Sequence, residues 1–156
     1  TVYGPWGRPD MALQKFAERI LEEKPIQIYN NGQMTRDFTY IGDLVESIIR
    51  LMDVLPNKAE HFDNDSLSPV APFRVVNIGN SNPRSLLDFI STLEECLGQQ
   101  AIREYLPMQP GDVPVTHADT TLLTNLTGYS PSTPIEHGIK EFADWFKDWY
   151  GKQLLL

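Results

Sequence analysis

The sequence predicts a mixed α/β fold. Apolar residues recur at helical spacing in several segments, and short runs rich in β-branched and aromatic residues alternate with those segments. Alternation of strands and helices along one chain is typical of α/β and α+β domains. With 156 residues, the chain is long enough to form one domain with its own hydrophobic core. The three tryptophans, Trp6, Trp145 and Trp149, are expected to pack in that core.

The first part of the chain combines one helix with two extended segments. A helix is expected over residues 9–24, because its apolar residues form one stripe, a proline suits its first position and Pro25 ends it. Residues 26–29 alternate between apolar and polar side chains and predict a strand. Residues 30–32, Asn-Asn-Gly, tolerate positive φ and predict a turn before an extended run over 35–40.

A second helix is expected to begin at Asp43, with Glu46 three residues later as its reciprocal cap. Its apolar residues cover a wide arc, which predicts burial against more than one neighbour. The segment that follows, residues 56–72, is polar, acidic and flanked by prolines. This composition predicts a mobile surface loop.

The second half of the chain continues the alternation of extended and helical segments. Prolines and capping residues before helical segments, and glycines after them, mark the expected boundaries. In order, the expected elements are a strand over 74–79, a helix from Pro83 to Gly98, extended segments over 102–106 and 115–118 on either side of a turn at 109–112, a short helix capped by Asp119 and ended by Gly128, and a last helix opened by a capping box from Thr133 to Glu136.

Charge, apolar run length and cysteine content indicate which partners and which cell compartment to expect. There are 13 Lys and Arg against 21 Asp and Glu, a net charge of −8, and the basic residues form no cluster suited to a nucleic-acid backbone. We therefore expect no nucleic-acid partner. The longest apolar runs fall far short of the roughly 20 residues that cross a bilayer, so no membrane partner is expected. The single cysteine, Cys96, allows no internal disulfide and favours the cytoplasm.

The sequence also lacks the usual patterns of catalytic, metal and cofactor sites. The three histidines, His61, His117 and His137, are not spaced like zinc ligands. There is no Gly-x-Ser-x-Gly hydrolase motif and no glycine-rich loop for a dinucleotide or a triphosphate. Cys96 has no obvious activating neighbour. Residue patterns alone therefore indicate no catalytic residue, no metal site and no cofactor site in this sequence.

Four stretches of the chain resemble NAD-dependent nucleotide-sugar epimerases and dehydratases of the extended short-chain dehydrogenase type. In order, they are TVYGPWGRPDMALQKF, IYNNGQMTRDFTYIGDLVESIIRL, NIGNSNPRSLLDFI and MQPGDVPVTHADTTLL. The runs VYGPWGRPDMA and LPMQPGDVP are especially similar to the UDP-glucuronate 4-epimerase family. The resemblance covers essentially the whole chain.

The resemblance implies that residues 1–156 form the C-terminal, nucleotide-sugar-binding half of an extended Rossmann-type epimerase. A Rossmann half that binds NAD and carries a catalytic Tyr-x-x-x-Lys pair would precede Thr1, and the helix from Asp43 would pack against it. Such an enzyme interconverts UDP-glucuronate and UDP-galacturonate through a 4-keto intermediate and forms a homodimer. Without the Rossmann half, the chain is expected to be inactive.

The resemblance also assigns residues to the nucleotide. Arg36 matches an arginine that binds the UDP diphosphate, which suits the paired donors of a guanidinium. The alternative is a surface arginine paired with Asp37 or Asp43. Asp112 matches a carboxylate that accepts hydrogen bonds from the ribose hydroxyls, although aspartate is also common in ordinary turns. Many relatives carry arginine where this chain has Gln109, so Arg36 would bind the phosphates with less help.

The remaining substrate-binding candidates lie near the N-terminus. Gln27 and Tyr29 match the strand that lines the uracil, although the Tyr29 ring could equally face the core. Thr1 and Arg8 are expected near the sugar, where they would bind the glucuronate carboxylate. The Met11 N–H, at the expected start of a helix, is a further candidate donor to an anion.

Two alternatives remain open at this point. The chain could be part of a dehydratase or decarboxylase that acts on the same nucleotide sugars, because the residues that decide between those reactions would lie outside it. It could also be a non-catalytic module that binds a UDP-sugar or docks to a partner domain. Turnover after addition of the Rossmann half would separate an enzyme from such a module.

Overall fold

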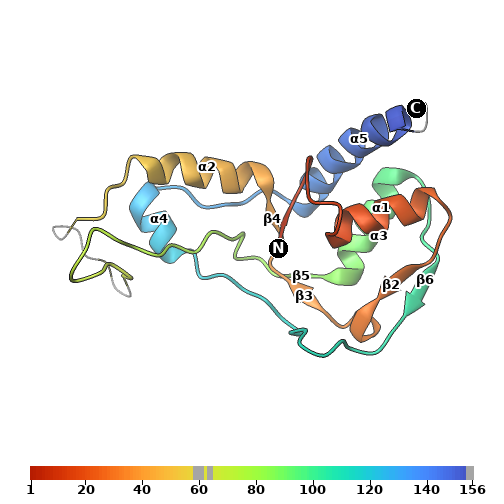
Figure 1. The fold of residues 1–156 in the computed structure, drawn as a ribbon, viewed down its shortest axis with the longest axis horizontal. Coiled ribbons are helices and arrows are strands. Elements are labelled where there is room, and N and C mark those ends of the chain that lie inside the picture. The colour runs from red at the N-terminus through yellow and green to blue at the C-terminus, as the bar shows by residue number, and fades with distance from the viewer. Residues whose placement is uncertain (58–61, 63–64, 154–156) are drawn as a thin grey trace.

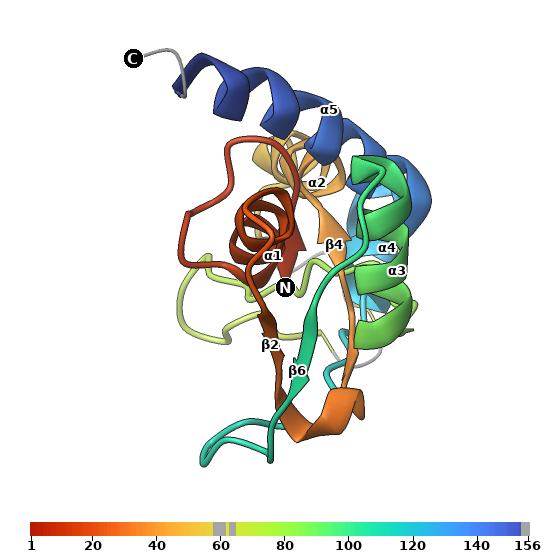
Figure 2. The ribbon, with the colours of Figure 1, turned by 90° about the vertical axis from the view of Figure 1, so that its right-hand side faces the viewer.

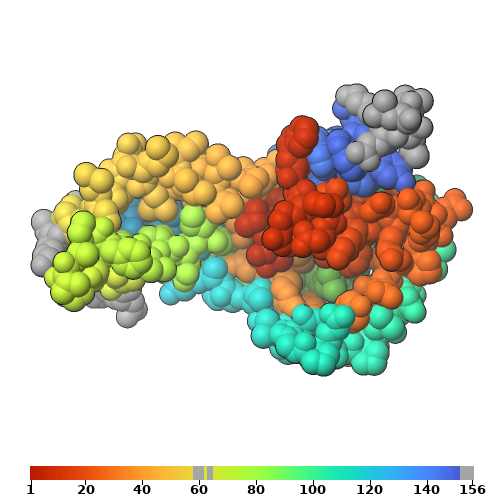
Figure 3. Space-filling model, in the orientation of Figure 1, coloured from red at the N-terminus to blue at the C-terminus, as the bar shows by residue number. Residues whose placement is uncertain are grey.

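The computed structural model describes residues 1–57, 62 and 65–153. In chain order, its elements are β1 (Val2–Tyr3), α1 (Ala12–Leu21), β2 (Ile26–Ile28), the 3-10 turn η1 (Tyr29–Gly32), β3 (Thr35–Arg36), β4 (Thr39–Tyr40), α2 (Ile41–Met52), β5 (Arg84–Ser85), α3 (Leu86–Leu97), β6 (Arg103–Tyr105), α4 (Thr121–Thr127) and α5 (Ile135–Gln153). The molecule is elongated: α1, α3 and α5 form one lobe, and α2 and α4 form an arm that extends from it (Figure 1, Figure 3). None of the helices in the described ranges combines the length and the apolar character needed to cross a membrane.

The described strands are short and pair two by two. β1 lies parallel to β4 and β2 lies parallel to β6, whereas β3 and β5 are antiparallel. An isolated bridge between Thr35 and Val115 joins the segment after β6 to β3. The expected run over 35–40 is split into β3 and β4, which pair with different partners. The mixture of helices with short, mostly parallel strand pairs confirms the predicted α/β class.

The main core lies in the lobe, where α3 packs against both α1 and α5 (Figure 2). Phe89 and Ile90 of α3 and Phe142 and Phe146 of α5 are almost completely buried. The Phe89 ring stacks on Phe38, with ring centroids 4.1 Å apart. The buried apolar residues of α5 are Ile135, Ile139, Phe142 and Phe146, whose helical spacing places them on one face.

The outer face of α2 is apolar and exposed. The opposite side of the helix packs against α4 and buries Asp43 and Ser47. The wide apolar arc predicted from the sequence is therefore present, but the described residues leave much of it uncovered. Its exposed apolar residues, together with one just beyond the helix, have 46% to 76% of their surface accessible: Val45, Ile48, Ile49, Met52 and Leu55.

α2 begins at Ile41, two residues before the predicted start, and Asp43 does not cap it. The buried Asp43 carboxylate instead accepts hydrogen bonds from the Tyr129 hydroxyl (2.8 Å) and from the N–H and hydroxyl of Thr133 (both 2.9 Å). Burial and the contact with Asp43 raise the pKa of Tyr129 to about 12. α5 begins at Ile135, so Thr133 does not adjoin the first helical residue and the predicted capping box is wrong. Asp43 and Thr133 join α2 to the start of α5.

Two other helices begin later than predicted. α1 begins at Ala12 because Met11 first closes a turn, in which its N–H donates to the Arg8 carbonyl (3.1 Å). α3 begins at Leu86, where the Ser85 side chain caps it by accepting a hydrogen bond from a backbone N–H of the first turn. The residues after Pro9 form this turn, and the two residues after Pro83 form β5, so neither proline is the first residue of its helix.

The segment over 74–79 is not a strand, which corrects the prediction. Within the described ranges no strand pairs with it, and Val75 is 58% exposed. The predicted helix ends are confirmed at Gly98 and Gly128, which follow α3 and α4 in the left-handed conformation that favours glycine.

The predicted loop over 56–72 is described only in part, because residues 58–61 and 63–64 lie outside the described residues. Its mobility stays a prediction. Within the loop, Asp65 forms an ion pair with Arg74, which lies just beyond it (2.9 Å), and both side chains are only 3% exposed. The Arg74 guanidinium holds the pKa of the Asp65 carboxyl below its usual value.

Candidate functional site

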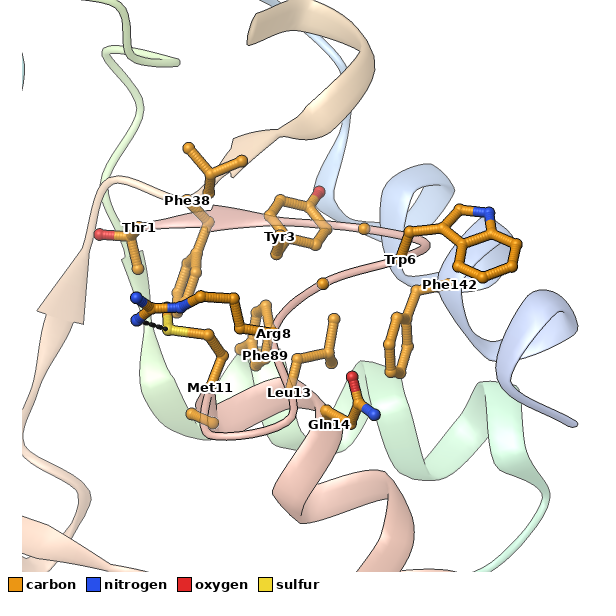
Figure 4. Close-up of a pocket in the computed structure, with 14 residues that line it drawn as sticks. Thr1, Tyr3, Trp6, Arg8, Met11, Leu13, Gln14, Phe38, Phe89 and Phe142 are labelled. Atoms are coloured by element: carbon orange, nitrogen blue, oxygen red, sulfur yellow. Dashed lines mark hydrogen bonds between the residues drawn. The ribbon is translucent and has the colours of Figure 1, made fainter. Parts of the chain in front are cut away.

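A cavity of about 370 Å³ lies under the loop that joins β1 to α1. Figure 4 shows this loop curving around the cavity from the end of β1 to the start of α1. Its lining includes three sequence candidates for the sugar end of a substrate, Thr1, Arg8 and Met11. The structure therefore brings these three residues together. Apolar side chains from other elements complete the wall: Leu13, Phe38, Phe89 and Phe142.

Arg8 and Met11 lie side by side at this cavity (Figure 4). The Arg8 Nη2 donates to the Met11 sulfur (3.3 Å) and also pairs with Asp10 (3.3 Å). Because the Arg8 side chain is 73% exposed, exchange of Asp10 for another anion costs little. The Met11 N–H donates to the Arg8 carbonyl (3.1 Å), so the predicted contact of this N–H with an anion would have to replace or share that bond and stays a prediction. Met11 contributes its side chain to the cavity.

Two further residues line this cavity: Trp6, which the sequence analysis placed in the core, and Gln14, which it did not single out. Trp6 is 80% exposed rather than buried in the core, with its ring 5.4 Å from that of Trp145 and a backbone φ of 61°. Gln14 of α1 is only 7% exposed, and its buried Oε1 has no hydrogen-bond partner in the described part of the chain. The one sequence signal for Gln14 is that a polar residue lies beside the apolar stripe of α1.

Arg36 lies on β3 and braces a distant segment. Its Nη1 donates to the carbonyls of Thr35 and Pro114, both at 3.0 Å. The carboxylates of Asp37 and Asp43, which were its alternative partners, bind other groups. Within the described ranges no carboxylate therefore neutralises the Arg36 guanidinium, and its charge suits a phosphate ligand.

The turn at 109–112 forms as predicted. The Asp112 N–H donates to the Gln109 carbonyl (3.2 Å), and the glycine between them has a positive φ of 90°. Gln109 is exposed and Asp112 is half-buried. The chain just after the turn meets β3 at the bridge between Thr35 and Val115, which holds the turn near Arg36.

Gln27 and Tyr29 lie on and just after β2. Tyr29 opens η1 rather than ending the strand, and its hydroxyl donates to the Gln27 Oε1 (3.2 Å). Gln27 is exposed and Tyr29 is half-buried, so neither side chain belongs to the fully buried core. β2 pairs with β6, which leads into the turn at 109–112. The nucleotide candidates therefore lie on three segments: β2 with η1, β3, and the turn after β6. The residues before that turn are hydrogen-bonded to β2 and η1, and the residues after it are hydrogen-bonded to β3.

The remaining reactive side chains form no second site in the part of the chain that is described. Burial raises the pKa of the Cys96 thiol, which disfavours the reactive thiolate. No three His, Cys, Asp or Glu side chains in the described ranges are placed to hold a metal ion. His61 lies outside the described residues.

Several known proteins that are similar to this chain are named UDP-glucuronate 4-epimerases. Residues 1–66 match the NAD dependent epimerase/dehydratase family. Over 96% of its length, the chain is 52% identical to a probable UDP-glucuronate 4-epimerase of Rhizobium meliloti, of which it covers 45%. Over 97% of its length, it is 40% identical to UDP-glucuronate 4-epimerase 1 of Arabidopsis thaliana, of which it covers 36%. The chain therefore spans less than half of the length of these relatives.

The fold of this chain is also similar to that of a solved epimerase structure. The crystal structure of UDP-glucuronic acid 4-epimerase from Bacillus cereus, in complex with UDP-glucuronic acid and NAD, superposes with a TM-score of 0.79 at 34% identity. The match covers 96% of this chain and 44% of that chain. The resemblance inferred from the four sequence stretches is thus confirmed over nearly the whole chain.

Proposed function

We propose that this chain is the nucleotide-sugar-binding part of a longer NAD-dependent epimerase, which interconverts UDP-glucuronate and UDP-galacturonate at C4. The observation that carries the proposal is similarity over 96% of the chain to UDP-glucuronate 4-epimerases, one of them crystallised with UDP-glucuronic acid and NAD. The sequence contains no glycine-rich dinucleotide loop. We therefore assign NAD and the catalytic base to a Rossmann part that precedes residue 1.

In this division of labour, the present chain holds the nucleotide while the sugar turns. Arg36 neutralises the diphosphate, and Asp112 accepts hydrogen bonds from the ribose. Gln27 and Tyr29 flank the uracil, and Gln109 lies at the edge of the turn. NAD, held by the Rossmann part, would supply a reversible hydride acceptor for C4, and the catalytic base of that part would take and return the proton of the C4 hydroxyl. The complete protein is proposed to be a cytoplasmic homodimer.

Rejoining the chain to a Rossmann part is the test of this function. The joined protein should convert UDP-glucuronate to UDP-galacturonate with bound NAD, whereas the chain alone should form no product. Chromatography of the nucleotide sugars distinguishes the alternatives. Binding without turnover would favour a non-catalytic module, and a product that has lost water or carbon dioxide would favour a dehydratase or a decarboxylase.

The sugar end of the site gives a prediction about selectivity. In the joined enzyme, Arg8→Ala should weaken binding of UDP-glucuronate by about tenfold and leave UDP-glucose unchanged, because only the former has a carboxylate for the guanidinium. Competition assays with the two nucleotide sugars measure this difference. Arg19→Ala, which removes an exposed arginine of α1 that bonds to the Pro25 carbonyl (2.9 Å), is the control. Equal losses for both sugars would contradict the assignment of Arg8 to the carboxylate.

The exposed face of α2 is proposed to pack against the Rossmann part. Ile49→Gln should change the free energy of unfolding of this chain by no more than about 0.5 kcal/mol relative to the wild type, because the Ile49 side chain is already 52% exposed. The same change should weaken association with a separately produced Rossmann part and reduce binding of a hydrophobic dye. Ile102→Gln, at a site that is 53% exposed near β6, is the matched control. If both variants behaved alike, α2 would not be the interface.

A further inference from the structure

Asp37, between β3 and β4, is a buried carboxylate that binds backbone groups of two distant segments. Its Oδ1 accepts a hydrogen bond from the Asn80 N–H (3.1 Å). Its Oδ2 accepts hydrogen bonds from the N–H groups of Ser81 (3.1 Å) and Ala118 (3.0 Å). Asp37 is only 5% exposed, and three charge-assisted hydrogen bonds offset the cost of burying its charge.

The backbone beside this carboxylate holds the second of those segments. The Thr35 N–H donates to the Pro114 carbonyl (2.9 Å), and the Thr116 N–H donates back to the Thr35 carbonyl (3.1 Å). The Asp37 N–H then donates to the Thr116 hydroxyl (3.1 Å). Residues 114–118 are therefore fixed to β3 by a continuous row of hydrogen bonds that ends at the Asp37 carboxylate.

The turn over 107–113 is held by hydrogen bonds of the residues on its two sides, which act as its anchors. On one side, the Leu106 N–H donates to the Ile28 carbonyl (2.9 Å) and the Leu106 carbonyl accepts from the Asn31 N–H (3.0 Å). On the other side is the segment that Asp37 holds. The exposed turn between the anchors carries two of the candidate UDP-binding residues, so its position depends on both anchors.

We propose that Asp37 is a positioning residue for UDP. It fixes the turn over 107–113 relative to Arg36, so that Arg36 and Asp112 reach one nucleotide together. This inference rests on the proposed function, in which those two residues bind UDP. A neutral amide does not replace the carboxylate, because its N–H₂ group would face a backbone N–H and leave at least one donor unpaired.

Gly79 offers a second way to disturb the same contact. A methyl group on Gly79 would lie 2.5 Å from the Ala118 Cβ and 2.9 Å from the Asp37 Oδ2, which is too close without a shift. Gly79→Ala removes no hydrogen-bonding group. Its main effect is therefore to displace Ala118 and the Asp37 carboxylate from their present positions beside residue 79.

The matched control is Asp43, a carboxylate that is also buried and also accepts three hydrogen bonds. Asp43 joins α2 to the start of α5, and its carboxylate binds Tyr129 and Thr133 rather than the segment over 114–118. Asp37→Asn and Asp43→Asn therefore each disturb a buried carboxylate that accepts three hydrogen bonds, the first beside the segment over 114–118 and the second between α2 and α5. Comparison of the two variants separates positioning of the turn from a general loss of stability.

Two measurements on the folded chain test the inference. Amide hydrogen exchange reports the anchoring of the turn, and calorimetric titration with UDP reports affinity. Asp37→Asn and Gly79→Ala should lose exchange protection at Ala118 and bind UDP about tenfold more weakly. Asp43→Asn should keep that protection and bind UDP as the wild type does.

Three other results would contradict the anchoring role, the positioning role or the proposed function. Unchanged exchange at Ala118 in Asp37→Asn would overturn the anchoring role. Equal losses of UDP affinity in Asp37→Asn and Asp43→Asn would overturn positioning in favour of general destabilisation. A wild-type chain that shows the expected exchange pattern but binds no UDP would instead overturn the proposed function, and the positioning role with it.

Discussion

Arg36→Ala should lower the affinity of this chain for UDP by about 30-fold, or about 2 kcal/mol, because a charge-assisted hydrogen-bond donor to the diphosphate is lost. The Arg36 guanidinium pairs with no carboxylate in the described ranges, so its charge is available to a ligand. Gln109, in the neighbouring turn, is neutral and supplies no replacement charge. Isothermal titration of UDP into the wild type and the variant measures the loss.

Two further variants make this result specific. Arg84→Ala is the matched control, because Arg84 faces Arg36 across the β3–β5 pair but forms an exposed ion pair with Glu136 (3.2 Å). Its removal should change the free energy of unfolding by no more than about 0.5 kcal/mol and leave UDP affinity unchanged. Arg36→Lys keeps the charge but loses the paired donors, so an intermediate affinity is expected.

The opposite pattern would place the phosphate elsewhere. If Arg36→Ala bound UDP normally while remaining folded, the guanidinium would serve only to brace the Pro114 carbonyl. If Arg84→Ala lost as much affinity as Arg36→Ala, the diphosphate would lie between the two arginines. The first result would remove Arg36 from the proposed site, and the second would enlarge the site.

Features with local signals were predictable from the sequence. Gly98 and Gly128 mark helix ends because a left-handed residue is needed there, and the turn at 109–112 follows from its own proline and glycine. The apolar face of α5 follows from helical spacing alone. Each of these features depends on residues that are close together in the chain.

Features that depend on distant contacts were not predictable. Asp43 looks like a cap, yet it binds Thr133, 90 residues away. Residues 74–79 have the composition of a strand, but within the described ranges they have no pairing partner. The capping box at Thr133 failed for a related reason, since both the N–H and the hydroxyl of that residue donate to Asp43.

The candidate site shows the same limit. Arg36 and Asp112 could be named only through the resemblance, because an arginine on a strand and an aspartate in a turn are individually common. The role of Asp37 depends on N–H groups up to 81 positions away, which no local pattern indicates. Gln14 was missed because one polar residue beside an apolar stripe is a weak signal.

Phe89→Ala should have the largest effect on stability, lowering the free energy of unfolding by about 3–5 kcal/mol. Phe89 is 1% exposed, stacks on Phe38, and meets Tyr3 edge-on with centroids 5.8 Å apart. Such a loss is a large share of the roughly 5–15 kcal/mol that stabilises a typical domain. Urea unfolding followed by circular dichroism measures the change. Phe73→Ala, at a site that is 59% exposed, should cost no more than about 0.5 kcal/mol.

Phe89→Leu separates the stacking of the rings from the filling of the core. Leucine keeps most of the buried volume, so this variant should lose less than about 2 kcal/mol and remain folded. Phe38 directly follows Asp37, so the stacked rings also support the backbone that anchors the segment after the turn over 107–113. Weaker UDP binding by folded Phe89→Leu would show that the core sets the geometry of the site. Unchanged binding would mean that the hydrogen bonds of Asp37 are sufficient to hold the turn in place.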